Sequence, residues 1–201
     1  MTGALTPANQ LTLLRMLLIP VLAILLIYGY GGAALLTFLV AGITDLLDGL
    51  IARWSGQKTD LGAWLDPMAD KLLLVTTFVM LTLPNQHLAN RLPVWLTVLM
   101  ISRDVGIVAT VAVVNLAVGR RTFKPSILGK IATATFILTG IATLYYNYLG
   151  RRSAVVDAFV YASLAATLVS GLHYLWHAIR GGRSVDALQE TAQPPAEDSR
   201  S

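Results

Sequence analysis

The chain has 201 residues, of which 55% are hydrophobic and 13% are charged, and its formal net charge is +4. Soluble domains carry about 25% charged residues, so this composition indicates a chain that is largely surrounded by lipid. The absence of cysteine excludes disulfides and thiolate metal sites. The sequence contains no basic stripe interleaved with aromatic residues, so it gives no sign of nucleic-acid binding.

Six apolar segments follow one another along the chain, and each is expected to form a membrane-spanning helix. They cover residues 11–28, 33–48, 66–83, 94–118, 125–146 and 155–179. Asp66 and Pro67 are typical of a helix start and are expected to begin the third segment. The first segment lacks a preceding basic region, which argues against a cleaved signal peptide. The expected fold is all-α, an integral membrane bundle of six transmembrane helices. We expect one membrane domain over residues 1–180 and a disordered polar tail over residues 181–201.

Lysine and arginine are unequally divided between the two sides of this bundle, and cytoplasmic loops carry the excess of such residues. One side carries Arg53, Lys58, Lys71, Arg120, Arg121, Lys124, Lys130, Arg180 and Arg183, whereas the other carries Arg91, Arg151 and Arg152. We therefore expect an integral protein of the cell inner membrane with both termini on the cytoplasmic side.

Five of the seven carboxylates that precede residue 185 lie within residues 45–70, where the second apolar segment ends and the third begins, and four of these five form two pairs. Asp45 and Asp48 are three positions apart, and Asp66 and Asp70 are four apart, so each pair shares one face of a helix. Two converging pairs would offer the oxygen ligands that Mg²⁺ and Mn²⁺ prefer. Helix capping and ion pairing are the structural alternatives, but charge between apolar helices is costly and usually marks function.

These carboxylates belong to a longer pattern that resembles the CDP-alcohol phosphotransferase family, also called CDP-alcohol phosphatidyltransferases. The family signature is D-x2-D-G-x2-A-R-x8-G-x3-D-x3-D, and it is matched by Asp45, Asp48, Gly49, Ala52, Arg53, Gly62, Asp66 and Asp70. Eight fixed positions without a gap make this match highly specific. The resemblance covers roughly residues 7–130.

The resemblance implies transfer of a phosphoryl-alcohol group from a CDP-alcohol with release of CMP. Two divalent cations held by carboxylates are a recurrent arrangement for displacement at phosphorus. By position in the motif, the metal ligands would be Asp45, Asp48, Asp66 and Asp70, and Asp70 would also be the general base. The nucleotide-binding residues would be Gly49, Ala52, Arg53 and Gly62, joined by Asn9 and Thr12, which share a face of the first helix with Arg15.

The acceptor side is expected to involve Arg103, Lys124 and Lys130. A salt bridge, either between Arg103 and Asp104 themselves or to another helix, explains these two residues about equally well. Snorkelling toward headgroups is an alternative for the two lysines. His173 and His177 are four positions apart, but their aromatic neighbours favour anchoring at the membrane interface over zinc binding.

Several segments are similar to family members that use CDP-diacylglycerol, among them P-A-N-Q-L-T-L-L-R and M-I-S-R-D. Phosphatidylglycerophosphate synthases commonly show G-K-x-K-T, whereas this chain has Ala132 in place of the second lysine. One cation fewer disfavours glycerol 3-phosphate as the acceptor. The F-K-P-S-I-L-G-K segment resembles eukaryotic-type cardiolipin synthases, which favours phosphatidylglycerol.

Two other classes of protein share some of these features. A membrane prenyltransferase also binds a pyrophosphate through aspartate pairs and Mg²⁺, but this class would not explain the presence of Gly49, Ala52 and Arg53. A divalent-cation transporter would need acidic groups along a path through the bilayer. The expected partners are CDP-diacylglycerol, a lipid or polyol-phosphate acceptor, membrane lipids and a second copy of the chain in a homodimer, with no nucleic acid.

Overall fold

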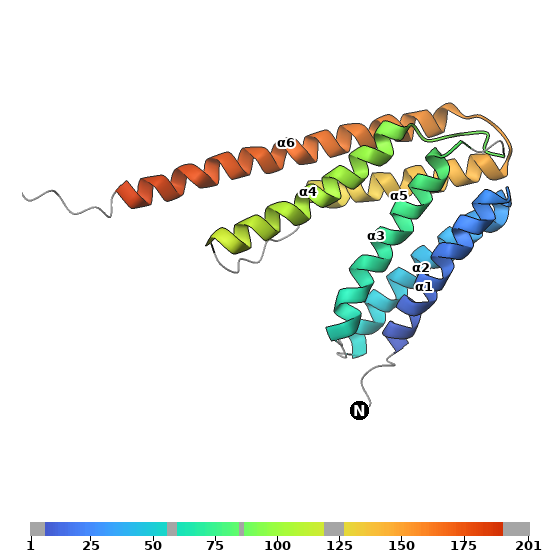
Figure 1. The fold of residues 1–201 in the computed structure, drawn as a ribbon, viewed down its shortest axis with the longest axis horizontal. Coiled ribbons are helices and arrows are strands. Elements are labelled where there is room, and N and C mark those ends of the chain that lie inside the picture. The colour runs from blue at the N-terminus through green and yellow to red at the C-terminus, as the bar shows by residue number, and fades with distance from the viewer. Residues whose placement is uncertain (1–6, 56–59, 85–86, 119–126, 191–201) are drawn as a thin grey trace, which may run out of the picture.

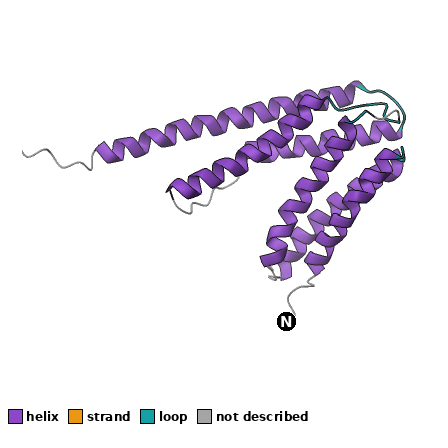
Figure 2. Cartoon of the chain, viewed as in Figure 1, coloured by secondary structure: helices purple, strands orange, loops and turns teal. Residues whose placement is uncertain are grey.

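The computed structural model describes residues 7–55, 60–84, 87–118 and 127–190, and these residues form six helices and no strand (Figure 2). The helices are α1 (Pro7–Ile27), α2 (Gly31–Ser55), α3 (Asp60–Thr82), α4 (Val94–Val118), α5 (Ile127–Tyr148) and α6 (Ala154–Glu190). The expectation of an all-α fold is confirmed.

Within the described residues, three helical stretches are long and apolar enough to cross a membrane. They are Gln10–Ile27, Ile127–Tyr148 and Ala154–Leu172, and a shorter apolar stretch covers Gly31–Leu47. These stretches are consistent with a helical membrane protein, while the number of six spans stays a prediction.

The helices form two arms that diverge from one end of the molecule (Figure 1). One arm consists of α1, α2 and α3, and the other consists of α4, α5 and α6. The α1–α2, α3–α4 and α5–α6 connections all lie at the end where the arms meet, which we call the closed end. Packing of α2 against α5 joins the arms. The other end, where α1 begins, is the open end.

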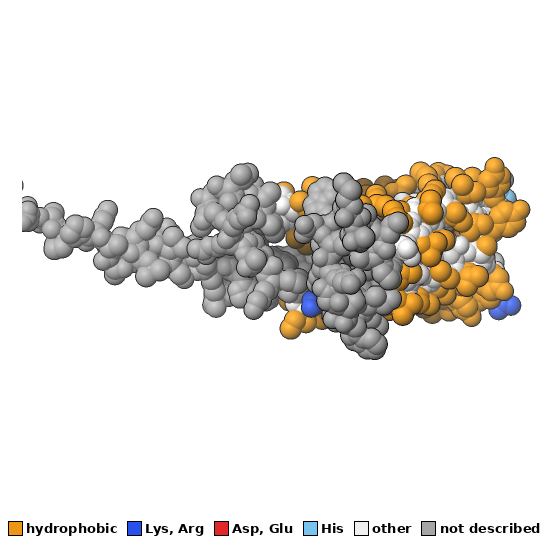
Figure 3. All heavy atoms as spheres, turned by 90° about the horizontal axis from the view of Figure 1, so that it is seen from below, with side chains coloured by type: hydrophobic (Ala, Val, Ile, Leu, Met, Phe, Trp, Pro, Cys, Tyr) orange, Lys and Arg blue, Asp and Glu red, His pale blue; other side chains and the backbone are white. Residues whose placement is uncertain are grey.

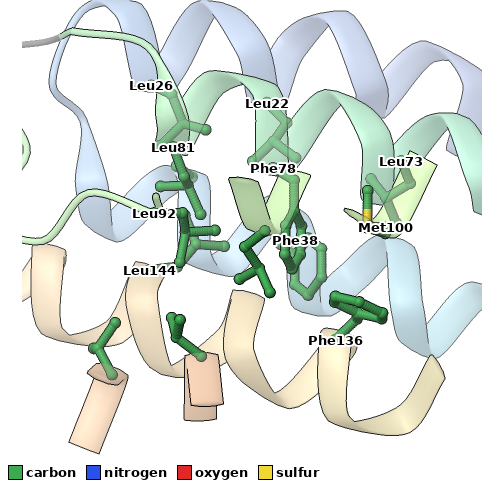
Figure 4. Close-up of a cluster of buried hydrophobic side chains, with 14 of the residues drawn as sticks. Leu22, Leu26, Phe38, Leu73, Phe78, Leu81, Leu92, Met100, Phe136 and Leu144 are labelled. Carbon is green, nitrogen blue, oxygen red and sulfur yellow. The ribbon is translucent and has the colours of Figure 1, made fainter. Parts of the chain in front are cut away.

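The hydrophobic core lies where the arms meet and draws on both of them (Figure 4). The ring of Phe78 on α3 meets the ring of Phe136 on α5 edge to face, with centroids 5.6 Å apart, an arrangement that aromatic pairs favour. Leu22, Leu81 and Leu144 are completely buried in the same cluster. Because this packing is concentrated near the closed end, the arms are held together there.

Side-chain hydrogen bonds also tie the closed end together. The side-chain amide of Asn147, near the end of α5, bonds to both backbone groups of Asn90, which precedes α4: Asn90 N–H donates to Asn147 Oδ1 over 2.6 Å, and Asn147 Nδ2 donates to Asn90 O over 3.0 Å. Asn90 Nδ2 further donates to the carbonyl of Arg151, and the Ser153 N–H donates to Asn90 Oδ1. These bonds satisfy buried backbone groups that would otherwise destabilise the two connections.

Two helices extend further around the aspartate motif than the sequence suggested. α2 continues past Asp48 to Ser55, because Leu50, Ile51, Ala52 and Arg53 include strong helix formers that outweigh Gly49. α3 begins at Asp60, so the expectation that Asp66 and Pro67 start this helix is wrong, and Pro67 lies inside it. The motif is therefore mostly helical.

The last helix is also longer than expected. α6 continues through residues 181–190, where the sequence suggested a disordered tail, and ends at Glu190. Ala187, Leu188 and Gln189 favour helix, and no proline occurs before Pro194. Residues 191–201 lie outside the described part of the chain.

Large apolar side chains cover much of the outer surface of the described residues (Figure 3). Examples from four helices are Leu17, Leu36, Val98 and Leu168, each more than half exposed. A soluble protein of this size rarely exposes continuous apolar patches, so this surface is suited to contact lipid tails.

Candidate active site

A buried arginine joins two of the predicted metal ligands. Arg15 on α1 is completely buried, and its Nη1 lies 3.1 Å from Oδ1 of Asp45 on α2 and 2.8 Å from Oδ1 of Asp70 on α3. The three helices of one arm thus converge on a single nitrogen. The carboxylates themselves remain accessible, with side-chain exposures of 38% and 42%, so a ligand can approach them from the open end.

The sequence placed Arg15 on the face of α1 that also carries Asn9 and Thr12. Thr12 is completely buried and lies one turn before Arg15, so this face points into the arm. The pairing of Arg15 with two aspartates was not predicted. The signal available in the sequence was a lone arginine within an apolar segment, which needs a counter-charge when buried.

The other motif residues are placed by their helices alone. Asp48, Gly49, Ala52 and Arg53 follow Asp45 on α2, and Gly62 and Asp66 precede Asp70 on α3. Helical spacing puts Asp48 on the face of Asp45 and Asp66 on the face of Asp70. Their side chains, like that of Asn9, lie outside the described ones, so their part in the site stays a prediction.

The described part of this site suits a hard cation. Asp45 and Asp70 offer carboxylate oxygens that converge on one positively charged group and face accessible space, which is the donor chemistry that Mg²⁺ and Mn²⁺ prefer. No cluster of three metal-ligating side chains occurs among the described residues. Asp48 and Asp66, which would complete such a cluster, are not described at the level of side chains.

A second charged cluster lies beside the first and links the two arms. Lys71, which directly follows Asp70 on α3, has its Nζ 3.7 Å from Oδ2 of Asp104 on α4. Asp104 Oδ1 also accepts from Nη1 of Arg103 over 3.3 Å. Charges of the α3 arm and of the α4 arm therefore meet next to Asp70.

Arg103 reaches onward from α4 to the first turn of α5. Its Nη2 donates to the carbonyl of Gly129 over 2.8 Å, and its Nη1 contacts Thr133 Oγ1. Its side chain is 13% exposed, and its buried Nε has no hydrogen-bond partner among the described residues. The interhelical role considered from the sequence is thus observed.

The structure describes only one of the two lysines predicted for the acceptor side. Lys130 is exposed and directly follows Gly129, so it lies in the same turn of α5 that Arg103 contacts. Lys124 lies outside the described residues. The structure therefore brings Arg103 and the backbone of Lys130 together, while binding of an acceptor stays a prediction. The side chains of His173 and His177 are also not described.

Comparisons with known proteins agree with the motif. The model of the family described as CDP-alcohol phosphatidyltransferase matches residues 5–170. A probable phosphatidylglycerophosphate synthase of Mycobacterium tuberculosis is 32% identical, over 92% of this chain and 86% of its own. The CMP-forming cardiolipin synthase of Homo sapiens is 35% identical, over 84% of this chain and 61% of its own.

A third relative is a CDP-diacylglycerol–glycerol-3-phosphate 3-phosphatidyltransferase of Haemophilus influenzae, 33% identical over 82% of this chain and 89% of its own. The family match includes α1 to α5 and the first part of α6, up to residue 170. It contains every residue of the aspartate motif and the arginine that joins two of its members. The chain belongs to the CDP-alcohol phosphatidyltransferase family.

Proposed function

We propose that this chain transfers a phosphatidyl group from CDP-diacylglycerol to phosphatidylglycerol, releasing CMP and forming cardiolipin. The observation that carries the transferase assignment is the convergence of Asp45 and Asp70 on the buried Arg15. This convergence assembles carboxylates from α2 and α3 into one accessible site, and the family membership supplies the chemical class.

The family uses divalent metal ions, and we propose that Asp45, Asp48, Asp66 and Asp70 hold two of them, Mg²⁺ or Mn²⁺. Bound there, the cations would neutralise the pyrophosphate of the donor. Gly49, Ala52, Arg53 and Gly62, with Asn9 and Thr12, would bind the cytidine and its phosphates, with Arg53 offering a planar fork for phosphate oxygens.

In the proposed reaction, Asp70 acts as the general base. The acceptor hydroxyl gives its proton to a carboxylate oxygen of Asp70 as the hydroxyl oxygen forms a bond to the phosphorus of the phosphatidyl group. The bond from that phosphorus to the bridging pyrophosphate oxygen breaks, and CMP leaves with the bonding electrons. Because Arg15 holds Oδ1 of Asp70, the carboxylate stays oriented while its exposed portion faces the acceptor.

The choice of acceptor rests on the first turns of α5. Ala132 is completely buried, so position 132 points into the protein and supplies no cation there. Arg103 and Lys130 remain as candidates to bind the acceptor phosphate, with Lys124. A phosphodiester such as that of phosphatidylglycerol carries one negative charge and needs fewer cations than a phosphate monoester.

Glycerol 3-phosphate is the second candidate acceptor. The names of the relatives from Mycobacterium tuberculosis and Haemophilus influenzae support it, whereas the human relative supports phosphatidylglycerol. The family membership gives no support to a prenyltransferase or a cation transporter. Purified protein is incubated with CDP-diacylglycerol, Mg²⁺ and each acceptor separately, and it should form cardiolipin with phosphatidylglycerol but no phosphatidylglycerophosphate with glycerol 3-phosphate. Phosphatidylglycerophosphate formed without cardiolipin would assign the alternative acceptor.

The proposed topology places the aspartate site and both termini on the cytoplasmic face of the cell inner membrane. Arg91, Arg151 and Arg152 belong to the α3–α4 and α5–α6 connections at the closed end, away from the lysine-rich and arginine-rich loops. This separation supports the orientation expected from the distribution of positive charge. Labelling of single cysteines at Arg151 and at Lys130 in intact cells tests it, since the reagent should reach Arg151→Cys alone.

A further inference from the structure

A cavity of about 510 Å³ lies at the closed end of the α1–α3 arm. Its apolar walls come from the last turns of α1 and α3, with Leu26, Ile27 and Met80, and from Leu83 just after α3. Met80 follows Asp70 by ten positions on α3, which corresponds to about 15 Å along a helix axis. The cavity is therefore separate from the aspartate site and lies at the opposite end of the arm.

Two nitrogen-bearing side chains of the α3–α4 connection complete the lining of this cavity, His87 and Arg91. Both are exposed. The combination of apolar walls with a polar, cationic edge matches the two parts of a phospholipid, a hydrocarbon tail and a charged headgroup. A soluble anion would leave the apolar walls in contact with water.

His87 packs closely against a glycine. Gly29, between α1 and α2, has φ of +79°, and a Cβ added there would lie 2.8 Å from Cγ of His87. Such a contact is too short for any larger residue, and the positive φ also favours glycine. The imidazole is thus seated on the α1–α2 turn at the edge of the cavity.

The surroundings of the cavity are positively charged. The carbonyl of Arg151 accepts from Asn90 Nδ2, and Nε of Arg152 donates to the carbonyl of Ala89, so both arginines are tied to the connection that carries Arg91. Among the described side chains near these connections, Asp157 is the only carboxylate. This excess of positive charge favours an anionic headgroup, while a zwitterionic lipid would bring its own ammonium group close to arginine.

We propose that this cavity binds one anionic phospholipid from the leaflet opposite the aspartate site. An acyl chain lies against the walls provided by α1 and α3, and the phosphate lies beside Arg91 and His87. This lipid is neither the donor nor the acceptor of the transfer reaction, because it binds at the other end of the arm. The proposal does not depend on which acceptor the enzyme uses.

The test measures lipid binding to the full-length protein by native mass spectrometry, with phosphatidylserine and phosphatidylcholine of identical acyl chains. The wild type should retain phosphatidylserine in preference to phosphatidylcholine. Arg91→Ala should weaken phosphatidylserine binding about fivefold, the effect of one cation near a lipid headgroup. Arg151→Ala is the matched control, because Arg151 is exposed at the same end but does not line the cavity.

A second pair of variants tests the apolar walls without changing charge. Ile27→Trp should fill the cavity and reduce binding, whereas Ile24→Trp, at an exposed position of the same helix that does not line it, should not. Transfer activity should persist in all four variants, which shows that they fold. Equal binding of the two lipids, an equal loss in Arg151→Ala, or normal binding by Ile27→Trp would each overturn the proposal.

Discussion

Nη1 of Arg15 lies 2.8 Å from Oδ1 of Asp70, although the two residues are 55 positions apart in the sequence. The arginine is completely buried while the aspartate side chain is 42% exposed. A planar guanidinium held in a fixed position restricts the orientation of the carboxylate that it binds. The catalytic role proposed for Asp70 therefore rests on a residue of a different helix.

Replacing Arg15 should separate metal binding from catalysis. In Arg15→Gln, the positive charge shared by Asp45 and Asp70 is removed, so their mutual repulsion would favour binding of a divalent cation. We expect half-maximal activity at a lower Mg²⁺ concentration, together with a turnover about tenfold lower because the base is less well oriented. A titration of activity against Mg²⁺ measures both quantities, and an unchanged turnover would show that Arg15 does not position Asp70.

Asp70→Asn should abolish proton acceptance while almost preserving the shape of the side chain. We expect transfer to fall by about 10²-fold or more, the usual scale of general-base catalysis, while CDP-diacylglycerol still binds. Binding of the donor and single-turnover transfer are measured separately. Loss of donor binding with little change in turnover would instead make Asp70 chiefly a metal ligand.

Removal of divalent cations should abolish activity. The same loss is expected for three single variants, Asp45→Asn, Asp48→Asn and Asp66→Asn, because each of them lacks one negatively charged oxygen ligand. Activity is assayed after exhaustive chelation and again after Mg²⁺ or Mn²⁺ is restored. His173→Ala serves as the control and should remain active. Turnover that survives chelation would contradict the two-metal proposal.

The absence of a side chain at Gly49, in the first half of the motif, should be needed for nucleotide binding. Gly49→Val on α2 is expected to prevent binding of CDP-diacylglycerol by filling the space proposed for the cytidine. Gly42→Val is a matched control on the same helix, since a Cβ at Gly42 would meet no atom within 4 Å. If Gly49→Val binds the donor as well as Gly42→Val does, the cytidine site lies elsewhere.

Stability of the closed end should depend on Asn90. Asn90→Ala leaves Asn147 Nδ2 with its bond to the Asn90 carbonyl but deprives the Arg151 carbonyl and the Ser153 N–H of their partners. The expected cost in free energy of unfolding is about 1–3 kcal/mol, the range for unsatisfied buried polar groups. Thermal unfolding in detergent measures the change. Thr37→Ala, which removes a bond within an exposed part of α2, should cost less.

The sequence predicted the helical class and the approximate position of every helix, because long apolar segments separated by glycine, proline and charged residues are a strong signal. It misjudged the ends of helices around the motif. The second segment was expected to end at Asp48 and the third helix to begin at Asp66 and Pro67, but the helices continue through Gly49 and include Pro67. The helix-forming residues around these positions outweigh such local signals, which are weak.

The aspartate motif was also visible in the sequence, since its spacing is regular and local. The partners of its members were not, because Arg15 contacts Asp45 and Asp70 only after α1, α2 and α3 have packed together. The same holds for Lys71 and Asp104, whose helices belong to different arms. Pairwise contacts between distant segments leave no periodic pattern in one sequence.

The separation of the molecule into two arms has an evolutionary consequence. The proposed donor-binding residues all lie on α1, α2 and α3, whereas Arg103 and Lys130, proposed for the acceptor, lie on α4 and α5. Mutations in the second arm can therefore alter the preferred alcohol without disturbing how CDP-diacylglycerol is held. One ancestral enzyme would in this way give rise to enzymes that attach different alcohols and so make phospholipids with different headgroups.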